Sequence, residues 1–151
     1  MTVNSSVTRA NIALLLNQQE LATLATMSQE NPYCNLVAFT PSDDLQTIYF
    51  STPRQSTKYA NIINNPNVAL LIDSRTQSGS DVQTGTAVTA IGTVVQDLQQ
   101  DTADLKDLHA GRHAQFKDFI YSSDCALLQI RVRRYVLVSS LRDVSVLEID
   151  V

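Results

Sequence analysis

Three short β-rich runs follow one another in the first third of the chain, at residues 21–29, 34–40 and 45–51. Only turn signals separate them, ENPY at 30–33 and PSDD at 41–44. Strands joined by such short turns pair as antiparallel hairpins. The runs therefore predict an antiparallel meander, and the chain lacks the regular alternation of strands and helices that a doubly wound fold requires.

Four further runs extend the predicted sheet, at residues 68–73, 86–96, 125–140 and 144–149. The first, VALLID, is nearly all apolar, which predicts a central strand buried on both faces. Gly92 in the second run indicates a bulge or a close backbone approach. The third alternates, with Leu128, Ile130 and Val132 facing one way and Gln129, Arg131 and Arg133 the other, while Arg134 points opposite to Arg131 and Arg133.

Three helical regions interrupt these strands. Residues 6–19 carry Ile12, Leu15 and Leu16 on one face, with Ser6 or Thr8 as the candidate N-cap. The helix that follows Ser56 carries Tyr59, Ile62 and Ile63 on one face and ends at NNPN (64–67), because the residue before a proline disfavours helical geometry.

The third helical region spans residues 97–123, with Asp97 or Asp101 as its cap and a break at Gly111. Residues 74–85 are polar and predict a mobile loop or a long hairpin turn. With six or seven strands and three or four helices, we expect a mainly β (α+β) fold. It is a small closed antiparallel β-barrel with flanking helices, formed by residues 1–151 as one domain.

The charge and the cysteines exclude several classes of function. The net charge is -4, whereas a general nucleic-acid binder needs a basic surface. No apolar run approaches the roughly 20 residues of a membrane span, and the N-terminal residues lack the order of a signal peptide. We therefore expect a cytoplasmic protein with neither nucleic-acid nor membrane partners. Cys34 and Cys125 lack metal-ligand spacing and are expected to be partly buried free thiols.

The stretch RQSTK gathers Arg54, Ser56, Thr57 and Lys58 at the start of the second helix. A helix N-terminus offers unpaired backbone N–H groups and partial positive charge, so it binds anions readily. A phosphate monoester would use the hydroxyls and the cations together. The alternative is that Ser56 is only an N-cap and that Arg54 and Lys58 are solvated surface residues.

The order of elements resembles the split-barrel flavin-binding family typified by pyridoxamine 5'-phosphate oxidase. The resemblance covers residues 20–96. It rests on five features in order: the strand NLVAFT, Phe50-Ser51, Ser56-Thr57-Lys58, Asn65-Pro66 and the strand Val68–Ile72. It implies a six- or seven-stranded antiparallel split β-barrel with flanking helices, and a homodimer with FMN between the subunits.

The resemblance also implies roles for particular residues. Thr57 and Lys58, helped by Ser56, match the phosphate-binding residues of the family. The backbone of the strand with Asn35, Val37, Ala38 and Thr40 matches the segment that lies along the isoalloxazine ring, and Phe50 and Ser51 match further flavin contacts.

Three departures from the family pattern argue against oxidation of vitamin B6. Asn35 and Thr40 stand where the oxidase has basic residues, and Ala87 stands where glutamine is usual. The expectation is an FMN-dependent oxidoreductase acting on a small-molecule substrate that the sequence does not identify, with no assigned catalytic residue. A flavin-binding sensor without catalytic activity is one alternative.

Both histidines of the chain lie four residues apart in the segment 107–119, as His109 and His113. This is a metal-like spacing, but no third ligand is evident and Gly111 is expected to interrupt the helix between them. They are therefore either ordinary surface or hydrogen-bonded histidines, or functional ones. The segment also resembles the haem-associated branch of the split barrels. That resemblance makes a haem-binding or haem-degrading protein, with His109 or His113 as the axial ligand, the second alternative.

Overall fold

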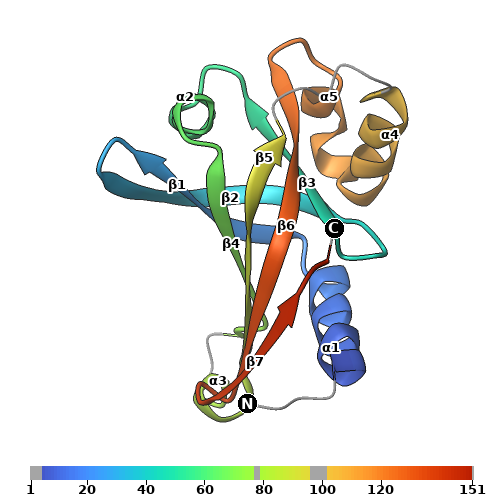
Figure 1. The fold of residues 1–151 in the computed structure, drawn as a ribbon. Coiled ribbons are helices and arrows are strands. Elements are labelled where there is room, and N and C mark those ends of the chain that lie inside the picture. Colours follow the sequence, from blue (N-terminus) through green and yellow to red (C-terminus); the bar gives the residue numbers. More distant parts are fainter. Residues whose placement is uncertain (1–4, 77–78, 96–101, 151) are drawn as a thin grey trace.

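Seven strands and several short helices make up the computed structural model, which describes residues 5–76, 79–95 and 102–150 (Figure 1). The strands are β1 (Leu21–Ser28), β2 (Asn31–Pro41), β3 (Thr47–Pro53), β4 (Asn67–Asp73), β5 (Thr86–Val95), β6 (Cys125–Ser139) and β7 (Asp143–Glu148). The helices are α1 (Ser5–Gln18), α2 (Thr57–Asn64), α3 (Asp81–Thr84), α4 (Thr102–Arg112), the 3-10 turn η1 (Ala114–Phe116) and α5 (Lys117–Ile120).

The strands form one antiparallel sheet in the order β3-β2-β1-β4-β5-β6-β7, and β3 also pairs with β6. This extra pairing, from Thr47 opposite Arg131 to Pro53 opposite Cys125, closes six strands into a barrel. β7 pairs with the C-terminal half of β6, from Arg134 to Ser139. The structure therefore confirms the predicted mainly β barrel with flanking helices.

Gly92 allows the close contact between β5 and β6. A Cβ atom at this position would lie 2.3 Å from the Arg131 carbonyl oxygen, well inside van der Waals contact. The strand register shifts at this point, so that Ile91 pairs with Arg134 while Gly92 pairs with Val132. The predicted bulge is thus confirmed. The extra residue leaves both Arg133 and Arg134 exposed, so the prediction that Arg134 points opposite to Arg133 is wrong.

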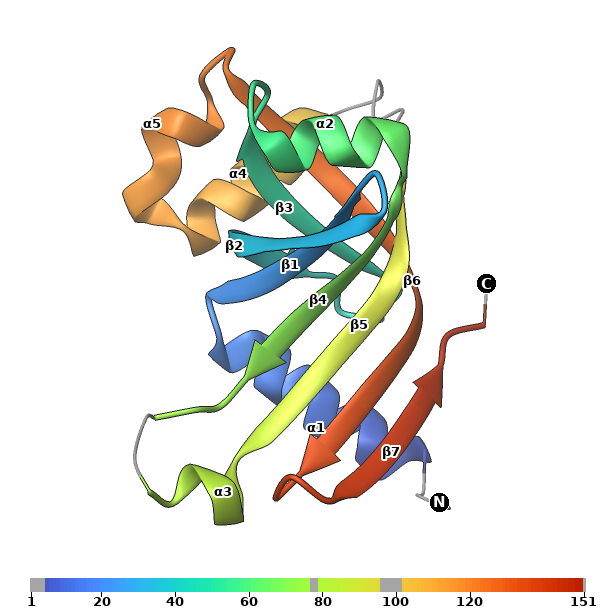
Figure 2. The ribbon, with the colours of Figure 1, turned by 90° about the vertical axis from the view of Figure 1, so that its left-hand side faces the viewer.

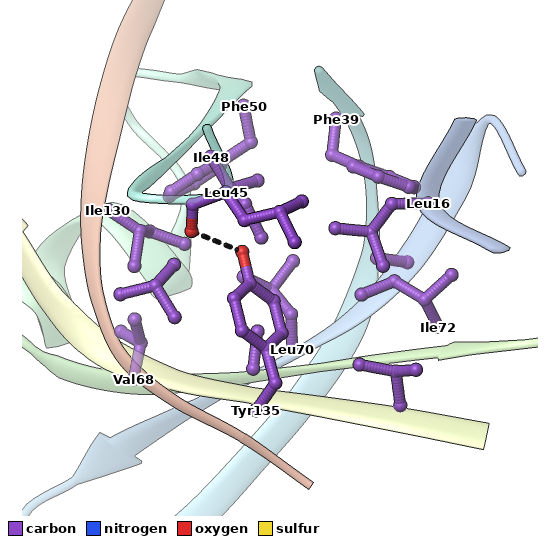
Figure 3. Close-up of a cluster of buried hydrophobic side chains, with 14 of the residues drawn as sticks. Leu16, Phe39, Leu45, Ile48, Phe50, Val68, Leu70, Ile72, Ile130 and Tyr135 are labelled. Carbon is purple, nitrogen blue, oxygen red and sulfur yellow. Dashed lines mark hydrogen bonds between the residues drawn. The ribbon is translucent and has the colours of Figure 1, made fainter. Parts of the chain in front are cut away.

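Branched and aromatic side chains from every strand belong to the buried core. Figure 3 shows part of this core, including Phe39, Phe50 and Tyr135. Tyr135 is fully buried, and its hydroxyl donates a hydrogen bond of 2.8 Å to the Leu45 carbonyl oxygen. Leu45 has a positive φ of 63° in the turn before β3. Its side chain is buried nonetheless, so Tyr135 holds an unusual turn against the core.

The helices lie outside the barrel, with α1 near one end and α2, α4 and α5 near the other (Figures 1 and 2). Ile12, Leu15 and Leu16 of α1 are buried in the barrel core, as the sequence predicted. No helix within the described ranges is long and apolar enough to cross a membrane.

Several local predictions are wrong. The first hairpin turns at Gln29 and Glu30, so Asn31, Pro32 and Tyr33 belong to β2 rather than to a turn. The strand β4 alternates between buried and exposed residues, with Leu71 outside, because one of its faces lines the barrel and the other is the outer surface.

The predicted helix ends and faces also need correction. Ser6 and Thr8 lie inside α1 and do not cap it. Ile63 of α2 is exposed, whereas Asn61 is buried and donates to the Thr26 hydroxyl. Residues 74–85 contain the short helix α3. The candidate caps Asp97 and Asp101 lie outside the described residues.

Gly111 does not break the third helical region at the predicted place. The helix α4 runs through it to Arg112, and the His113 N–H still donates to the His109 carbonyl oxygen at 3.0 Å. Of the two free thiols, Cys125 is buried and Cys34 is exposed rather than partly buried.

Candidate functional site

An apolar cavity of about 480 Å³ lies on the outer side of the barrel, between β2 and β3, the start of α2 and the η1–α5 segment. Nine residues line it: Leu21, Leu36, Val37, Ala38, Ser51, Pro53, Lys58, Phe116 and Phe119. Four of these, Val37, Ala38, Ser51 and Lys58, are among the residues that the family resemblance indicated. The structure therefore brings together side chains from segments far apart in the sequence.

Alternation along β3 separates Ser51 from Phe50. Ser51 faces outward and lines the cavity, whereas the Phe50 side chain is fully buried in the barrel core. Phe50 therefore presents only its backbone toward the outer surface, and its side chain does not take part in the cavity.

The start of α2 is held by its predicted N-cap. Ser56 Oγ accepts a hydrogen bond of 3.2 Å from the Tyr59 N–H and lies 2.9 Å from Thr52 Oγ1. Because Ser56 Oγ makes both of these hydrogen bonds within the protein, Ser56 stabilises the loop before α2. Thr57, in the first turn, is exposed and does not line the cavity.

Lys58 is the titratable residue of the cavity lining. It is half-buried, and desolvation lowers the pKa of its ammonium group. Among the described residues it has no salt-bridge partner, since the ion pairs found there join Arg75 to Asp73 and Arg134 to Glu148. A partly desolvated cation without a counter-charge favours an anionic ligand.

Arg54 serves the fold instead of the cavity. Its Nε donates to the Ser123 carbonyl oxygen at 3.1 Å, and its backbone N–H donates to the Asp124 carbonyl oxygen at 2.8 Å. These bonds tie the loop before α2 to the loop before β6. The Arg54 guanidinium therefore already donates a hydrogen bond within the protein. Lys58, and not Arg54, is the cation in the cavity wall.

His109 lies behind the cavity wall and bridges the two strands that form it. Its Nδ1 lies 2.7 Å from Thr40 Oγ1, and its Nε2 lies 3.0 Å from Ser51 Oγ. The residue is fully buried. Burial and the positive charges of His113 and Arg112 lower its pKa to about 4, so the ring is neutral at pH 7.

His113 and Arg112 dock the end of α4 on the barrel. His113 Nε2 lies 2.7 Å from the Phe39 carbonyl oxygen, which also accepts from Arg112 Nε at 3.1 Å. Arg112 Nη2 donates to the carbonyl oxygens of Leu16, at 2.7 Å, and Gln19 at the end of α1. Burial lowers the pKa of His113, whose Nδ1 is buried and has no hydrogen-bond partner within the described part of the chain.

These contacts bear on the two histidines as candidate haem ligands. Both are fully buried, neither lines the cavity, and their ring centroids are 4.7 Å apart. Either ring would have to leave its bonds to the barrel before it reached an iron atom. Their four-residue spacing places His109 in the last turn of α4 and His113 directly after that helix, with both rings against the barrel.

The cavity residues that sequence reasoning missed come mainly from the segment after α4. Phe116 and Phe119 form an aromatic wall, whereas Ile120 at the end of α5 is fully buried and does not line the cavity. Leu36 and Leu21 extend the apolar lining from β2 and β1. The available signal was the pair of phenylalanines three residues apart, which the structure places in η1 and in α5.

Asn35 and Thr40, at the two ends of the indicated part of β2, do not line the cavity. Thr40 is buried against His109. Asn35 is half-buried, and its Oδ1 is buried without a hydrogen-bond partner among the described residues. An orphaned buried oxygen is rare in native proteins, and this one lies outside the cavity lining.

Comparison with known proteins supports the fold and the family. The family model described as pyridoxamine 5'-phosphate oxidase matches residues 8–139. No curated protein gives a significant match.

Three solved structures illustrate the range of similar proteins. A haem-binding protein from Mycobacterium smegmatis is 18% identical with a TM-score of 0.79, and the alignment covers 93% of this chain but only 57% of that one. General Stress Protein 26 from Bacillus anthracis str. Sterne is 21% identical with a TM-score of 0.74, covering 94% and 98%. A FAD-binding protein from Mesorhizobium loti is 16% identical with a TM-score of 0.68, covering 85% and 90%. At these identities the likeness shows a shared fold.

Proposed function

The chain belongs to the pyridoxamine 5'-phosphate oxidase family, and from this premise we propose that it binds FMN in the cavity between β2, β3, α2 and α5. The observation that carries the proposal is the combination of an apolar cavity with one unpaired, half-buried cation, Lys58, in the first turn of a helix. FMN combines a flat aromatic ring system with a phosphate. The ring system would match the apolar lining of the cavity, and the phosphate would match Lys58.

The residues around the cavity fit this cofactor. Lys58 and the backbone N–H groups at the start of α2 would hold the phosphate. Val37 and Ala38 would lie along one side of the ring system, with Phe116 and Phe119 opposite.

We further propose an oxidoreductase. Bound FMN supplies electron and hydride transfer, and the protein supplies binding and orientation. The nine lining residues contain neither a carboxylate nor a histidine. The chemistry would therefore depend on the cofactor and on the substrates that reach it.

A second copy of the chain would complete the site. The outer surfaces of β2, β1 and β4 form a strip on which the exposed side chains of Leu36 and Leu71 flank Thr23, which pairs with both residues. Leu36 is 65% exposed and Leu71 is 37% exposed. Since Leu36 also lines the cavity, a partner seated on this strip would cover the cavity mouth. Sedimentation analysis should then give a dimer, and Leu71→Glu should give monomers.

The decisive experiment is a titration of the purified protein with FMN, followed by its visible spectrum and by quenching of flavin fluorescence. Saturable binding that Lys58→Ala weakens and Lys106→Ala leaves unchanged would support the proposal. Lys106 is a suitable control because it is also half-buried but lies outside the cavity lining. A protein that does not bind FMN would refute it.

Haem binding is the second candidate, because one protein with the same fold is named as haem-binding. The apolar cavity suits a porphyrin, but the buried histidines argue against His109 or His113 as its ligand. A Soret band on addition of haem, in a protein that ignores FMN, would favour this candidate. Bound FMN without turnover by NADH or NADPH would favour a flavin-binding sensor.

A further inference from the structure

The hydrogen-bonded chain Thr40–His109–Ser51 links the barrel wall to the cavity. Thr40 and His109 are buried, and Ser51 ends the chain in the cavity lining. The two distances, 2.7 Å and 3.0 Å, are those of ordinary hydrogen bonds. The direction in which each bond is donated determines what Ser51 presents to a ligand.

Only one direction satisfies every group. A neutral imidazole has one N–H donor and one acceptor nitrogen. If Nδ1 carried the proton, Thr40 Oγ1 would accept it, and the Thr40 hydroxyl hydrogen would have no acceptor among the described residues. A buried donor without a partner is costly. The Thr40 hydroxyl therefore donates to Nδ1, and the proton of the ring is on Nε2.

The same assignment fixes Ser51. Its Oγ accepts a hydrogen bond from His109 Nε2–H, so its own hydroxyl hydrogen is free. No other partner of Ser51 exists among the described residues. The remaining direction for that hydrogen is into the cavity. The low pKa of His109 agrees with a ring that stays neutral at pH 7.

We propose that His109 is a positioning residue that makes the Ser51 hydroxyl a hydrogen-bond donor toward the cavity. The site would thus select ligands that place an acceptor, a ring nitrogen or a carbonyl oxygen, opposite Ser51. With FMN as the ligand, this inference rests on the proposed function and adds a polar contact to its ring system.

The tautomer is tested without any ligand. Long-range proton–nitrogen correlation spectra of the 15N-labelled protein at pH 7 distinguish protonated from unprotonated ring nitrogens. His113 is an internal reference, because its Nε2 faces a carbonyl oxygen and must carry a proton. We expect both rings in the Nε2–H form. A ring in the Nδ1–H form would have to be His109 and would overturn the inference.

A double-mutant cycle on FMN affinity tests the link between the two residues. Ser51→Ala should weaken binding about tenfold, the usual effect of one lost hydrogen bond, and Ser51→Thr should restore it. His109→Leu should weaken binding in the native background and have no further effect on Ser51→Ala. Additive losses would mean that His109 has only a structural role, and would overturn the inference. If the wild-type protein does not bind FMN, the proposed function fails, and the NMR result still decides the tautomer.

Discussion

The Arg112 guanidinium carbon lies 5.2 Å from the centroid of the Phe39 ring, and the same side chain donates to the Phe39 carbonyl oxygen. Arg112 also donates to two carbonyl oxygens at the end of α1. One side chain from the second half of the chain thereby joins β2 and α1.

Replacing Arg112 should destabilise the protein strongly. Arg112→Ala removes a cation–π contact and charge-assisted hydrogen bonds to three carbonyl oxygens, for an expected loss of about 2–4 kcal/mol. Urea unfolding measures this loss as a lower midpoint. The matched control is Arg142→Ala, since Arg142 is exposed and should change stability by about 0.5 kcal/mol or less. Equal effects of the two substitutions would contradict the docking role of Arg112.

The two glycines with opposite surroundings should respond to alanine with opposite signs. Gly92→Ala would place a methyl group against the Arg131 backbone, so the strands must separate, and we expect a loss of about 2 kcal/mol or more. Gly111→Ala meets no atom within 4 Å and improves helix propensity in α4, so it should stabilise by about 0.5–1 kcal/mol. Thermal melts of both variants test this pair. A neutral Gly92→Ala would argue against the close contact at the bulge.

Stability should fall as the pH decreases from about 6.5 to about 4. The pKa of His109 is lowered to about 4 in the folded protein, whereas the unfolded chain takes up the proton near 6.5. The unfolded state therefore binds more protons in this window, and the stabilisation present above pH 6.5 is lost through it. The loss from His109 is about 3 kcal/mol. His113, whose pKa is also lowered, adds in the same direction.

Unfolding free energies of the wild type and of His109→Gln across this pH range measure the effect. Glu20, Arg112 and His113 are the charged or titratable neighbours that act on this pair, and they are unchanged in the variant. The variant should show a flatter profile. A slope as steep as that of the wild type would assign the pH dependence to other groups.

Charge at Lys58 should control FMN affinity through the phosphate. Lys58→Ala should weaken binding by roughly 10–100-fold, the effect of a lost charge-assisted hydrogen bond, while Lys58→Arg keeps most of it. The wild-type affinity should fall with added salt, and the Lys58→Ala affinity should fall less. Riboflavin, which lacks the phosphate, gives the comparison. An equal loss of riboflavin affinity in the variant would show that Lys58 contacts the ring instead.

The strands could be predicted from the sequence because the alternation of inward and outward side chains is a local pattern. Leu128, Ile130 and Val132 face the interior as predicted, and Gly92 marks the bulge. The prediction for Arg134 was wrong because the bulge adds one residue to β6, and one extra residue reverses the alternation beyond the bulge. Gly111 lies inside a helix because the docking of His109 and Arg112 outweighs its weak helix propensity.

The site was readable only in part. Ser51 and Lys58 follow from an ordered set of motifs near one another in the chain, and the structure places both in the cavity wall. Phe116 and Phe119 reach the same cavity from a segment about 60 residues later, through contacts that no local pattern encodes. The hydrogen bonds of His109 to two different strands are likewise tertiary, so the sequence left its role open.

The helices α4 and α5, which lie between β5 and β6 in the sequence, affect the exchange of any ligand. β5 and β6 pair directly, from Thr86 opposite Ser139 to Val95 opposite Gln129. The helices between them can therefore detach without breaking a strand pair, and such a local opening costs less than global unfolding. Since Phe116 and Phe119 would leave with these helices, the bonds of His109, Arg112 and His113 would oppose such an opening. The residence time of a ligand and the hydrogen exchange of α4 would then change together.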